Sequence, residues 1–515
     1  MGGAPDALLA AGRWPEAAAA YRQALENEPT SVAARLGLAR ALAGAGDGLT
    51  AGAWLADAIR LAPDDPQPVR LLADLLLQQE RCAEALPLYL QLLDRFGLRS
   101  VPNLVHAGYC HEQADQVEQA VALYREALQH DPALLEAHVN LAGTLWRLED
   151  FAGALHHGQQ AVALAPHHAF AQRILGTAWL QSNRVDEAQR HLREAMRLKP
   201  DFPHAALDLA MTLLLAGRLA EGWPLWEQRW RDARLKRPAF FRADAEWPGP
   251  SAPLQGKAIA VYGEQGWGDV LQCLRHLPQL QALGAQVRCV LAPELLTLVE
   301  ASFPGVHCLR PGEVVDVHFH AALMELPGRL GTTLDTIPAQ VPYLRAPDAA
   351  RVRWGERLQA WGGQRRIGLA WSGSHAQVNN RNRAMPLSLL LPVARLPGVQ
   401  CFSLQADDAL AWTDVVPAPG ELVDLTAEWA DFADSAAMLE QLDLVITVDT
   451  AIAHLAGALG KPVWIMLPPN ADWRWLLERE DSPWYPTARL FRRAHGEPRE
   501  AQVARVLQAL QAWLS

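Results

Sequence analysis

Small apolar residues recur at fixed places through the first two hundred residues. Five prolines mark the period, with intervals of 34, 69, 34 and 34 residues, at Pro29, Pro63, Pro132, Pro166 and Pro200. An alanine lies five and twelve residues before each proline, at Ala24 and Ala17, Ala58 and Ala51, Ala127 and Ala120, Ala161 and Ala154, and Ala195 and Ala188. Two antiparallel helices cross closely only where side chains are small, and a proline ends the second helix because it lacks an N–H. The pattern therefore predicts a row of stacked helix pairs.

A period of 34 residues with small residues at these offsets is typical of tetratricopeptide (TPR) repeats. The interval of 69 residues holds two units and one inserted residue, with Gly97 near the missing proline position. The unit over 64–97 is degraded, since Leu92 stands where alanine is expected. One more helix pair follows Asp201. We therefore expect a TPR α-solenoid over residues 1–236, whose concave surface binds a protein or peptide.

Beyond residue 255 short apolar runs alternate with amphipathic segments. The runs that predict strands cover residues 258–263, 287–292, 366–373, 399–405, 443–448 and 462–468. Such alternation indicates parallel sheets buried on both faces. Two successive sets of strands predict two Rossmann-like domains, over 256–350 and 351–515, after a linker over 237–255. The fold class is thus α + α/β, with ligands expected in a cleft at the carboxyl ends of the strands.

Composition narrows the class of protein. Lysine and arginine number 46 against 57 aspartates and glutamates, and the resulting net charge of −11 argues against a nucleic-acid partner. No stretch of about 18 apolar residues predicts a transmembrane segment, and the first residues show no signal peptide. Six scattered cysteines without a CxxC pair indicate a reducing compartment and no zinc site. We therefore expect a cytoplasmic protein.

The first candidate site is the turn GEQGWGD over 263–269, directly after an apolar run. Gly266 and Gly268 let the backbone approach a ligand closely, and the helix that follows favours a negative charge nearby. Asp269 ends this turn. It is either a general base at the cleft or only a cap of the following helix.

The second candidate site is the loop over 371–386, which carries Arg381 and Arg383 after the small polar residue Ser372. Arginine suits a diphosphate because its planar fork binds oxygens in pairs. A solvated loop with surface arginines is the alternative.

The third candidate site opens a helix after the apolar run 443–448. Asp449 and Thr450 begin this helix, where free N–H groups can hold a pyrophosphate. His454 follows Thr450 by four residues and so lies on the same helix face. The alternative is a helix cap with a buried histidine.

Several strings resemble the heptosyltransferase-like glycosyltransferases, and more closely the branch of that family fused to TPR repeats. These strings are GEQGWGD, GLAWSGS, NNRNRAMPL, CFSLQ, VDTAIAHLAGALGKPVW and DWRWLLERED. The resemblance implies a GT-B fold of two Rossmann-like domains, with the acceptor near the first and a nucleotide sugar in the second. It also implies an inverting reaction without a metal or other cofactor, the nucleotide-diphosphate sugar being the donor substrate.

The resemblance assigns roles by position in these strings. Asp269 matches the catalytic aspartate of the family. The donor-binding residues are expected to be Gly266, Gly268, Ser372, Arg381, Arg383, Gln405, Asp449, Thr450 and His454. Glu325 departs from the pattern, because the TPR-fused relatives usually carry a small serine there, and it puts a charge near the cleft.

The expected function is transfer of a sugar from a nucleotide sugar to a protein or peptide held by the TPR array. The alternative is a non-catalytic TPR scaffold whose GT-B half only binds a nucleotide or a partner. His318 and His320 alternate onto one face of a predicted strand, but no third ligand is apparent, so no metal site is expected.

Overall fold

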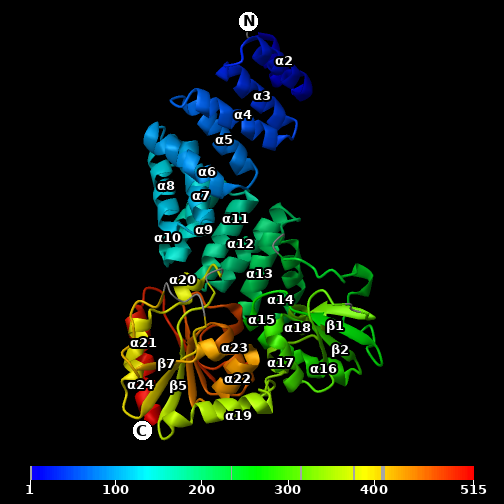
Figure 1. The fold of residues 1–515 in the computed structure, drawn as a ribbon, viewed down its shortest axis with the longest axis vertical. Coiled ribbons are helices and arrows are strands. Elements are labelled where there is room, and N and C mark those ends of the chain that lie inside the picture. Colours follow the sequence, from blue (N-terminus) through cyan, green and yellow to red (C-terminus); the bar gives the residue numbers. More distant parts are fainter. Residues whose placement is uncertain (1–2, 233–234, 314–315, 375–376, 407–411) are drawn as a thin grey trace. The chain divides into compact units, whose positions relative to one another are not determined.

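The computed structural model describes residues 3–232, 235–313, 316–374, 377–406 and 412–515 of the chain (Figure 1). These residues form two compact units, Met1–His167 and His168–Ser515. The predicted domain boundaries divide the chain more finely than these two units and remain predictions.

The first unit consists of antiparallel helices. They are α1 (Gly3–Ala10), α2 (Trp14–Asn27), α3 (Val32–Gly44), α4 (Gly48–Leu61), α5 (Pro66–Gln78), α6 (Cys82–Leu90), α7 (Val101–Gln113), α8 (Val117–His130), α9 (Leu135–Thr144) and α10 (Phe151–Leu164). Most of the alanines that mark the period are fully buried, among them Ala17, Ala51, Ala58, Ala120 and Ala127. The predicted helix pairs are therefore confirmed.

Two glycines lie where a tyrosine of the neighbouring helix comes close to the backbone. A Cβ atom on Gly108 would lie 2.6 Å from the ring of Tyr124, and one on Gly37 would lie 2.3 Å from the ring of Tyr21. Both tyrosines belong to second helices of a pair and are buried. Each glycine therefore makes room for an aromatic ring on its neighbour, within the pair α7 and α8 for Gly108 and between α3 and the preceding α2 for Gly37.

The inserted residue of the degraded repeat has a local structural consequence. Helix α6 continues as a π-helix, η1 (Gln91–Arg95), and Gly97 follows it with a positive φ of 64°. A π-helical turn takes up one residue more than an α-helical turn. The single insertion in the 69-residue interval is thus absorbed at the end of this helix, and the repeat pattern resumes at α7.

The second unit begins with the remaining repeat helices. They are α11 (Ala169–Gln181), α12 (Val185–Leu198), α13 (Pro203–Leu215) and α14 (Leu219–Trp226), followed by the 3₁₀ turn η3 (Glu227–Arg231). The final pair predicted after Asp201 is therefore present. Its aromatic residues Trp223 and Trp226 are buried within this unit.

A four-stranded parallel sheet follows. Its strands are β1 (Ala258–Tyr262), β2 (Gln286–Val290), β3 (His307–Leu309) and β4 (Phe319–Ala322), in the order β3-β2-β1-β4. The helices of this domain are α15 (Trp267–Cys273), α16 (Leu277–Ala282), α17 (Pro293–Ser302) and α18 (Leu326–Arg329). The predicted linker packs beside β4, where Glu246 pairs with His320 and Trp247 is fully buried.

The second sheet has six parallel strands. They are β5 (Arg365–Ala370), β6 (Val399–Ser403), β7 (Leu422–Asp424), β8 (Leu444–Val448), β9 (Val463–Leu467) and β10 (Ala488–Arg492), in the order β10-β9-β8-β5-β6-β7. The helices are α19 (Asp348–Arg357), α20 (Asn380–Arg383), α21 (Leu387–Ala394), α22 (Phe432–Glu440), α23 (Ala451–Ala458) and α24 (Arg499–Leu514).

The six-stranded sheet is covered on both faces. Helices α21 and α24 pack on one face around Ile367 and Ile446, whereas α22 and α23 pack on the other around Val445 and Ile465 (Figure 1). The expected pair of Rossmann-like domains is confirmed. Among the described helices, none is long and apolar enough to cross a membrane.

Candidate functional site

Helix α15 brings Asp269 to the carboxyl end of β1. The N–H of Gly266 donates to Asp269 Oδ2 at 3.1 Å, so the carboxylate does cap the start of this helix. Its other oxygen, Oδ1, accepts from Nη2 of Arg474 at 2.5 Å. The side chain of Asp269 remains 22% exposed. The carboxylate therefore combines a capping contact with a surface that a ligand can reach.

The surroundings of Asp269 shift the pKa of its carboxyl in opposite directions. Burial raises the pKa of this carboxyl above its ordinary value. The positive charge of Arg474 opposes the rise, whereas the neighbouring carboxylate of Asp472 adds to it. A carboxylate with a raised pKa is a better proton acceptor than an ordinary aspartate. The site thus suits acid–base chemistry.

The starts of α15 and α23 lie against each other because of a glycine. A Cβ atom on Gly268 would lie 2.8 Å from Cδ2 of His454 and 3.6 Å from Cα of Ala451. Any larger residue would push the two helices apart. Gly268 therefore brings the carboxyl end of β1 next to the carboxyl end of β8, as expected for a cleft between two parallel sheets.

At the start of α23, Thr450 caps the helix. Its Oγ1 accepts from the N–H of Ile452 at 3.2 Å. The backbone oxygen of Asp449 accepts from Nη1 of Arg383 at 2.7 Å. Burial raises the pKa of the Asp449 carboxyl to about 6, and the nearby Asp472 adds to the rise while Arg383 opposes it.

His454 is buried behind this turn. Its Nδ1 lies 2.9 Å from the hydroxyl of Tyr485, and its ring stacks on Trp475 with centroids 5.3 Å apart. Burial, together with the charges of Arg474 and other arginines, holds the pKa of His454 well below its ordinary value. The imidazole is therefore neutral and lies 3.9 Å from the carboxylate of Asp449.

Side-chain hydrogen bonds hold the loop after β5 next to the start of α23. Gln405 Oε1 accepts from the N–H of Ser372 at 2.9 Å, and Asn380 Nδ2 donates to Ser372 Oγ at 3.2 Å. Asn380 Oδ1 in turn accepts from Nε of Arg383 at 3.1 Å. Ser372 and Gln405 thus hold the loop that carries Arg383.

Glycine also makes room for Arg383, because a Cβ atom on Gly373 would lie 2.2 Å from its guanidinium. Arg381, the other predicted arginine, is exposed on α20, and its backbone oxygen accepts from Arg499. The structure therefore brings Arg383, and not Arg381, against Asp449. Residues 375–376 of the predicted loop lie outside the described residues.

Sequence reasoning missed the residue that joins the two halves of the site. Arg474 lies in the 3₁₀ turn η11 (Trp473–Trp475) and contacts Asp269, Asp472 at 2.7 Å and Gln272 at 2.6 Å. The string DWRWLLERED contributed to the family resemblance, but no spacing rule singled out its arginine. Only the fold shows that the turn after β9 reaches Asp269.

The carboxylate of Glu325, the residue that departs from the family pattern, lies among positively charged side chains. Its carboxylate accepts from Nε1 of Trp230 at 2.6 Å and lies 3.8 Å from Arg229 and 3.7 Å from Arg237. Its side chain is buried in the 3₁₀ turn η6 (Leu323–Glu325). The charge is therefore paired with arginines from η3 and from the segment that follows it.

The two histidines of the predicted HxH pattern have other partners. His318 Nδ1 accepts from the N–H of Ala258 at 3.2 Å, and His320 Nε2 lies 2.7 Å from the backbone oxygen of Arg242. Within the described part of the chain, no group of three or more histidine, cysteine, aspartate or glutamate side chains could hold a metal ion.

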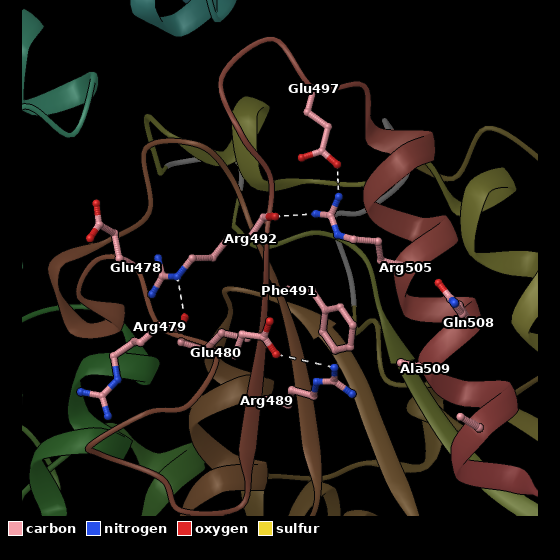
Figure 2. A pocket seen from close by; sticks show the side chains of 12 residues that line it. Glu478, Arg479, Glu480, Arg489, Phe491, Arg492, Glu497, Arg505, Gln508 and Ala509 are labelled. Carbon is pink, nitrogen blue, oxygen red and sulfur yellow. Dashed lines mark hydrogen bonds and ion pairs between the residues drawn. The ribbon is translucent and has the colours of Figure 1, made fainter.

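A cavity of about 840 Å³ lies elsewhere, between β10 and α24 (Figure 2). Its arginines are already engaged: Arg489 lies 3.6 Å from Glu480, and Arg505 pairs with Glu497. Arg492 donates to the backbone oxygen of Arg479 at 2.8 Å. The cavity is lined by residues other than those predicted for the donor or the acceptor.

Comparison with known proteins identifies the two parts of the chain. Models described as tetratricopeptide repeat match residues 8–75 and the overlapping segments 70–134, 107–169, 139–188 and 175–235. The model of glycosyltransferase family 9 (heptosyltransferase) matches residues 421–467, which include Asp449 and Thr450.

A relative matches most of this chain. Protein FlbA of Caulobacter vibrioides is 30% identical over 415 residues, which are 74% of this chain and 67% of FlbA. Two solved structures are also similar over part of the chain, and one of them, YrrB, is described as a TPR protein. YrrB is 19% identical, with a TM-score of 0.33, over 36% of this chain and 96% of its own. PilF of Pseudomonas aeruginosa is 17% identical, with a TM-score of 0.34, over 39% of this chain and 91% of its own. The chain therefore belongs to the family of TPR-repeat proteins fused to a heptosyltransferase-like glycosyltransferase domain.

Proposed function

We propose that the protein is an inverting, metal-independent glycosyltransferase. It moves a sugar from a nucleotide-diphosphate sugar to a protein or peptide held by the TPR array. The observation that carries this proposal is the meeting of Asp269 with the start of α23. There a carboxylate with a raised pKa faces a turn flanked by two arginines, Arg383 and Arg474.

In the proposed reaction Asp269 takes the proton from the acceptor nucleophile. The nucleophile forms a bond to the anomeric carbon of the sugar while the bond from that carbon to the diphosphate oxygen breaks. One direct displacement of this kind inverts the anomeric centre. Breaking this bond leaves a further negative charge on the diphosphate, and fixed positive charges stabilise such a group as its charge develops. Arg383 and Arg474 supply those charges without a metal ion.

The TPR repeats support the part of the proposal that concerns a protein or peptide acceptor. TPR helices in both units indicate a protein–protein interaction surface, and a concave face of stacked helix pairs fits an extended peptide. All six cysteines are free, as is usual in the reducing cytoplasm, where we place the reaction.

A thermal-shift screen of nucleotide sugars tests the donor half of this proposal. A true donor binds the native state, so it raises the melting temperature, and the stabilisation grows with the logarithm of its concentration above Kd. We expect at least one nucleotide sugar to do so, and the same compound to lose its sugar when a protein acceptor is added. Binding without release of the nucleoside diphosphate, across acceptors prepared from a bacterial lysate, would favour the scaffold alternative.

A further inference from the structure

The last repeat helices pack on the turn that contains Arg474. Trp223 and Trp226 of α14 meet the ring of Trp473 edge to face, with centroids 5.5 Å and 6.0 Å apart. Helix α13 also packs against η11. All of these residues belong to the unit His168–Ser515. The ring of Trp473 thus packs against side chains from the repeats as well as against Trp484.

Trp473 in turn supports Arg474. The guanidinium carbon of Arg474 lies 4.4 Å from the centroid of the Trp473 ring. The side chain of Arg474 is only 7% exposed and donates to Asp269, Asp472 and Gln272. A planar guanidinium stacked on an aromatic face and bonded on three sides has little freedom. A continuous row of contacts therefore runs from α14 to the carboxylate of Asp269.

A second contact reaches the same helix start from the other side. Nη2 of Arg229, in η3, lies 2.8 Å from the carboxylate of Glu264. Glu264 belongs to the glycine-rich turn that leads into α15, and both side chains are at most 2% exposed. Burial raises the pKa of Glu264 to about 7, while Arg229 opposes the rise. The repeats thus contact the turn before Asp269 through Arg229, and they also support Arg474, which pairs with Asp269.

We infer that the final TPR pair is a working part of the catalytic centre, in which Trp473 is a positioning residue that holds Arg474 against Asp269. This inference rests on the proposed function, because it takes Asp269 to be the base. The repeats then do more than carry the acceptor, since the geometry of the base depends on α14. The pairing also has an electrostatic consequence: without the opposite charge in place, Asp269 holds its proton to a higher pH.

The test measures the titration of Asp269 itself and needs no substrate. The protein is labelled with ¹³C at the aspartate side-chain carboxyl, and Asp269→Asn identifies the resonance of interest by its loss. Chemical shift against pH gives the midpoint for wild type, Trp473→Leu, Arg474→Gln and Arg474→Lys. Trp361→Leu is the matched control, because Trp361 also lies edge to face on a ring, Phe402, with an arginine, Arg357, 5.8 Å away.

We expect the midpoint to rise by roughly 1–3 pH units in Arg474→Gln, since an oppositely charged neighbour is lost. Arg474→Lys restores most of the wild-type value. Trp473→Leu raises the midpoint by roughly 0.5 unit, as befits the loss of one cation–π contact. Trp361→Leu leaves it unchanged. Trp226→Leu shifts the midpoint in the same direction as Trp473→Leu, and Trp226→Phe restores it.

An unchanged midpoint in both Trp473→Leu and Trp226→Leu would overturn the inference, even if Arg474→Gln moved it. An unchanged midpoint in Arg474→Gln would overturn it as well. Failure of the proposed function shows differently, as the absence of any nucleotide sugar that binds, and leaves these midpoints where they are. If Arg474→Gln does not fold, Trp473→Leu and Trp226→Leu still decide the matter.

Discussion

Two helix starts meet at the cleft, and they offer different chemistry although they are built alike. Helices α15 and α23 each follow a buried parallel strand and approach each other at Gly268. Helix α15 is capped by the carboxylate of Asp269, which a distant arginine holds by its other oxygen. Helix α23 is capped by the neutral hydroxyl of Thr450 and is backed by the neutral His454.

The difference shows that the capping side chain, and not the helix start as such, decides what a site can do. A carboxylate cap with a raised pKa can exchange a proton. A hydroxyl cap backed by a neutral imidazole adds no negative charge of its own, so the helix start favours an anion most when the neighbouring Asp449, whose pKa is about 6, is protonated. In the proposed function the chemistry therefore belongs to the α15 side and donor binding to the α23 side. The predictions below separate these two roles.

The largest effect is expected on the α15 side. Asp269→Asn should reduce transfer by roughly 10²–10⁴-fold, because a general base is lost while the capping oxygen is kept. The affinity for the nucleotide sugar should stay close to that of wild type. Turnover and calorimetric affinity are measured on the same preparations. Near wild-type turnover would mean that Asp269 only caps its helix.

The next effect concerns the α23 side. Arg383→Met should weaken binding of the nucleotide sugar about 10–100-fold, as expected when a charged hydrogen-bond donor is lost. Arg381→Met is the matched control, since Arg381 lies two residues earlier on the same short helix but is exposed. We expect it to have a much smaller effect. Equal losses in both variants would show that the contact of Arg383 with Asp449 does not define the donor site.

Removal of the outer repeats should separate donor from acceptor. A chain that begins after Leu98 keeps the whole unit His168–Ser515, which contains all of the proposed donor residues. We expect donor affinity to be unchanged and transfer to a protein acceptor to fall roughly tenfold or more, because a second binding surface is lost. Undiminished transfer would mean that the outer repeats dock another partner and do not select the acceptor.

The smallest effect is a dependence of donor binding on pH. Asp449 has a pKa of about 6, and a diphosphate bound beside it favours the protonated form. Binding therefore takes up a proton above pH 6, and the affinity should fall by up to about tenfold per pH unit above that value. Below pH 6 it should be constant. The donor itself does not interfere, because an intact nucleotide sugar has no phosphate group that titrates near pH 6.

Asp449→Asn is the control for this prediction and should abolish most of the slope. Glu264, whose pKa is about 7, remains in that variant, so any residual slope measures its contribution. His454 contributes nothing in this range, since its pKa lies well below the ordinary value. A full slope in Asp449→Asn would assign the proton to another group.

Structural features that depend on residues close together in the sequence could be predicted from the sequence. The 34-residue period located the helix pairs because every pair repeats the same local contacts, as at Ala120 and Ala127. Even the inserted residue before Gly97 was visible in the spacing, although its form as a π-helix was not. The two sheets followed from short apolar runs, and the cleft at the carboxyl ends of the strands, where α15 meets α23, followed from the way such folds bind ligands.

Features set by distant segments were not predictable. Arg474 lies 205 residues after Asp269, in an irregular turn without a periodic pattern. The distinction between Arg381 and Arg383 depends on the short helix α20, and the pairing of Glu325 with Arg229 depends on how the last repeat packs on the first sheet. In each case the sequence indicated the chemical group that the residue carries. The residue that it contacts could be identified only from the tertiary structure.

The most direct test of this division is a crystal structure of the full chain with the nucleoside diphosphate of the donor found in the screen. We predict that the diphosphate oxygens lie within hydrogen-bonding distance of Arg383 and of the first turn of α23, with the sugar side of the site open toward Asp269. Density for the diphosphate elsewhere, for example among Arg479, Arg492 and Arg505 in the cavity between β10 and α24, would contradict it.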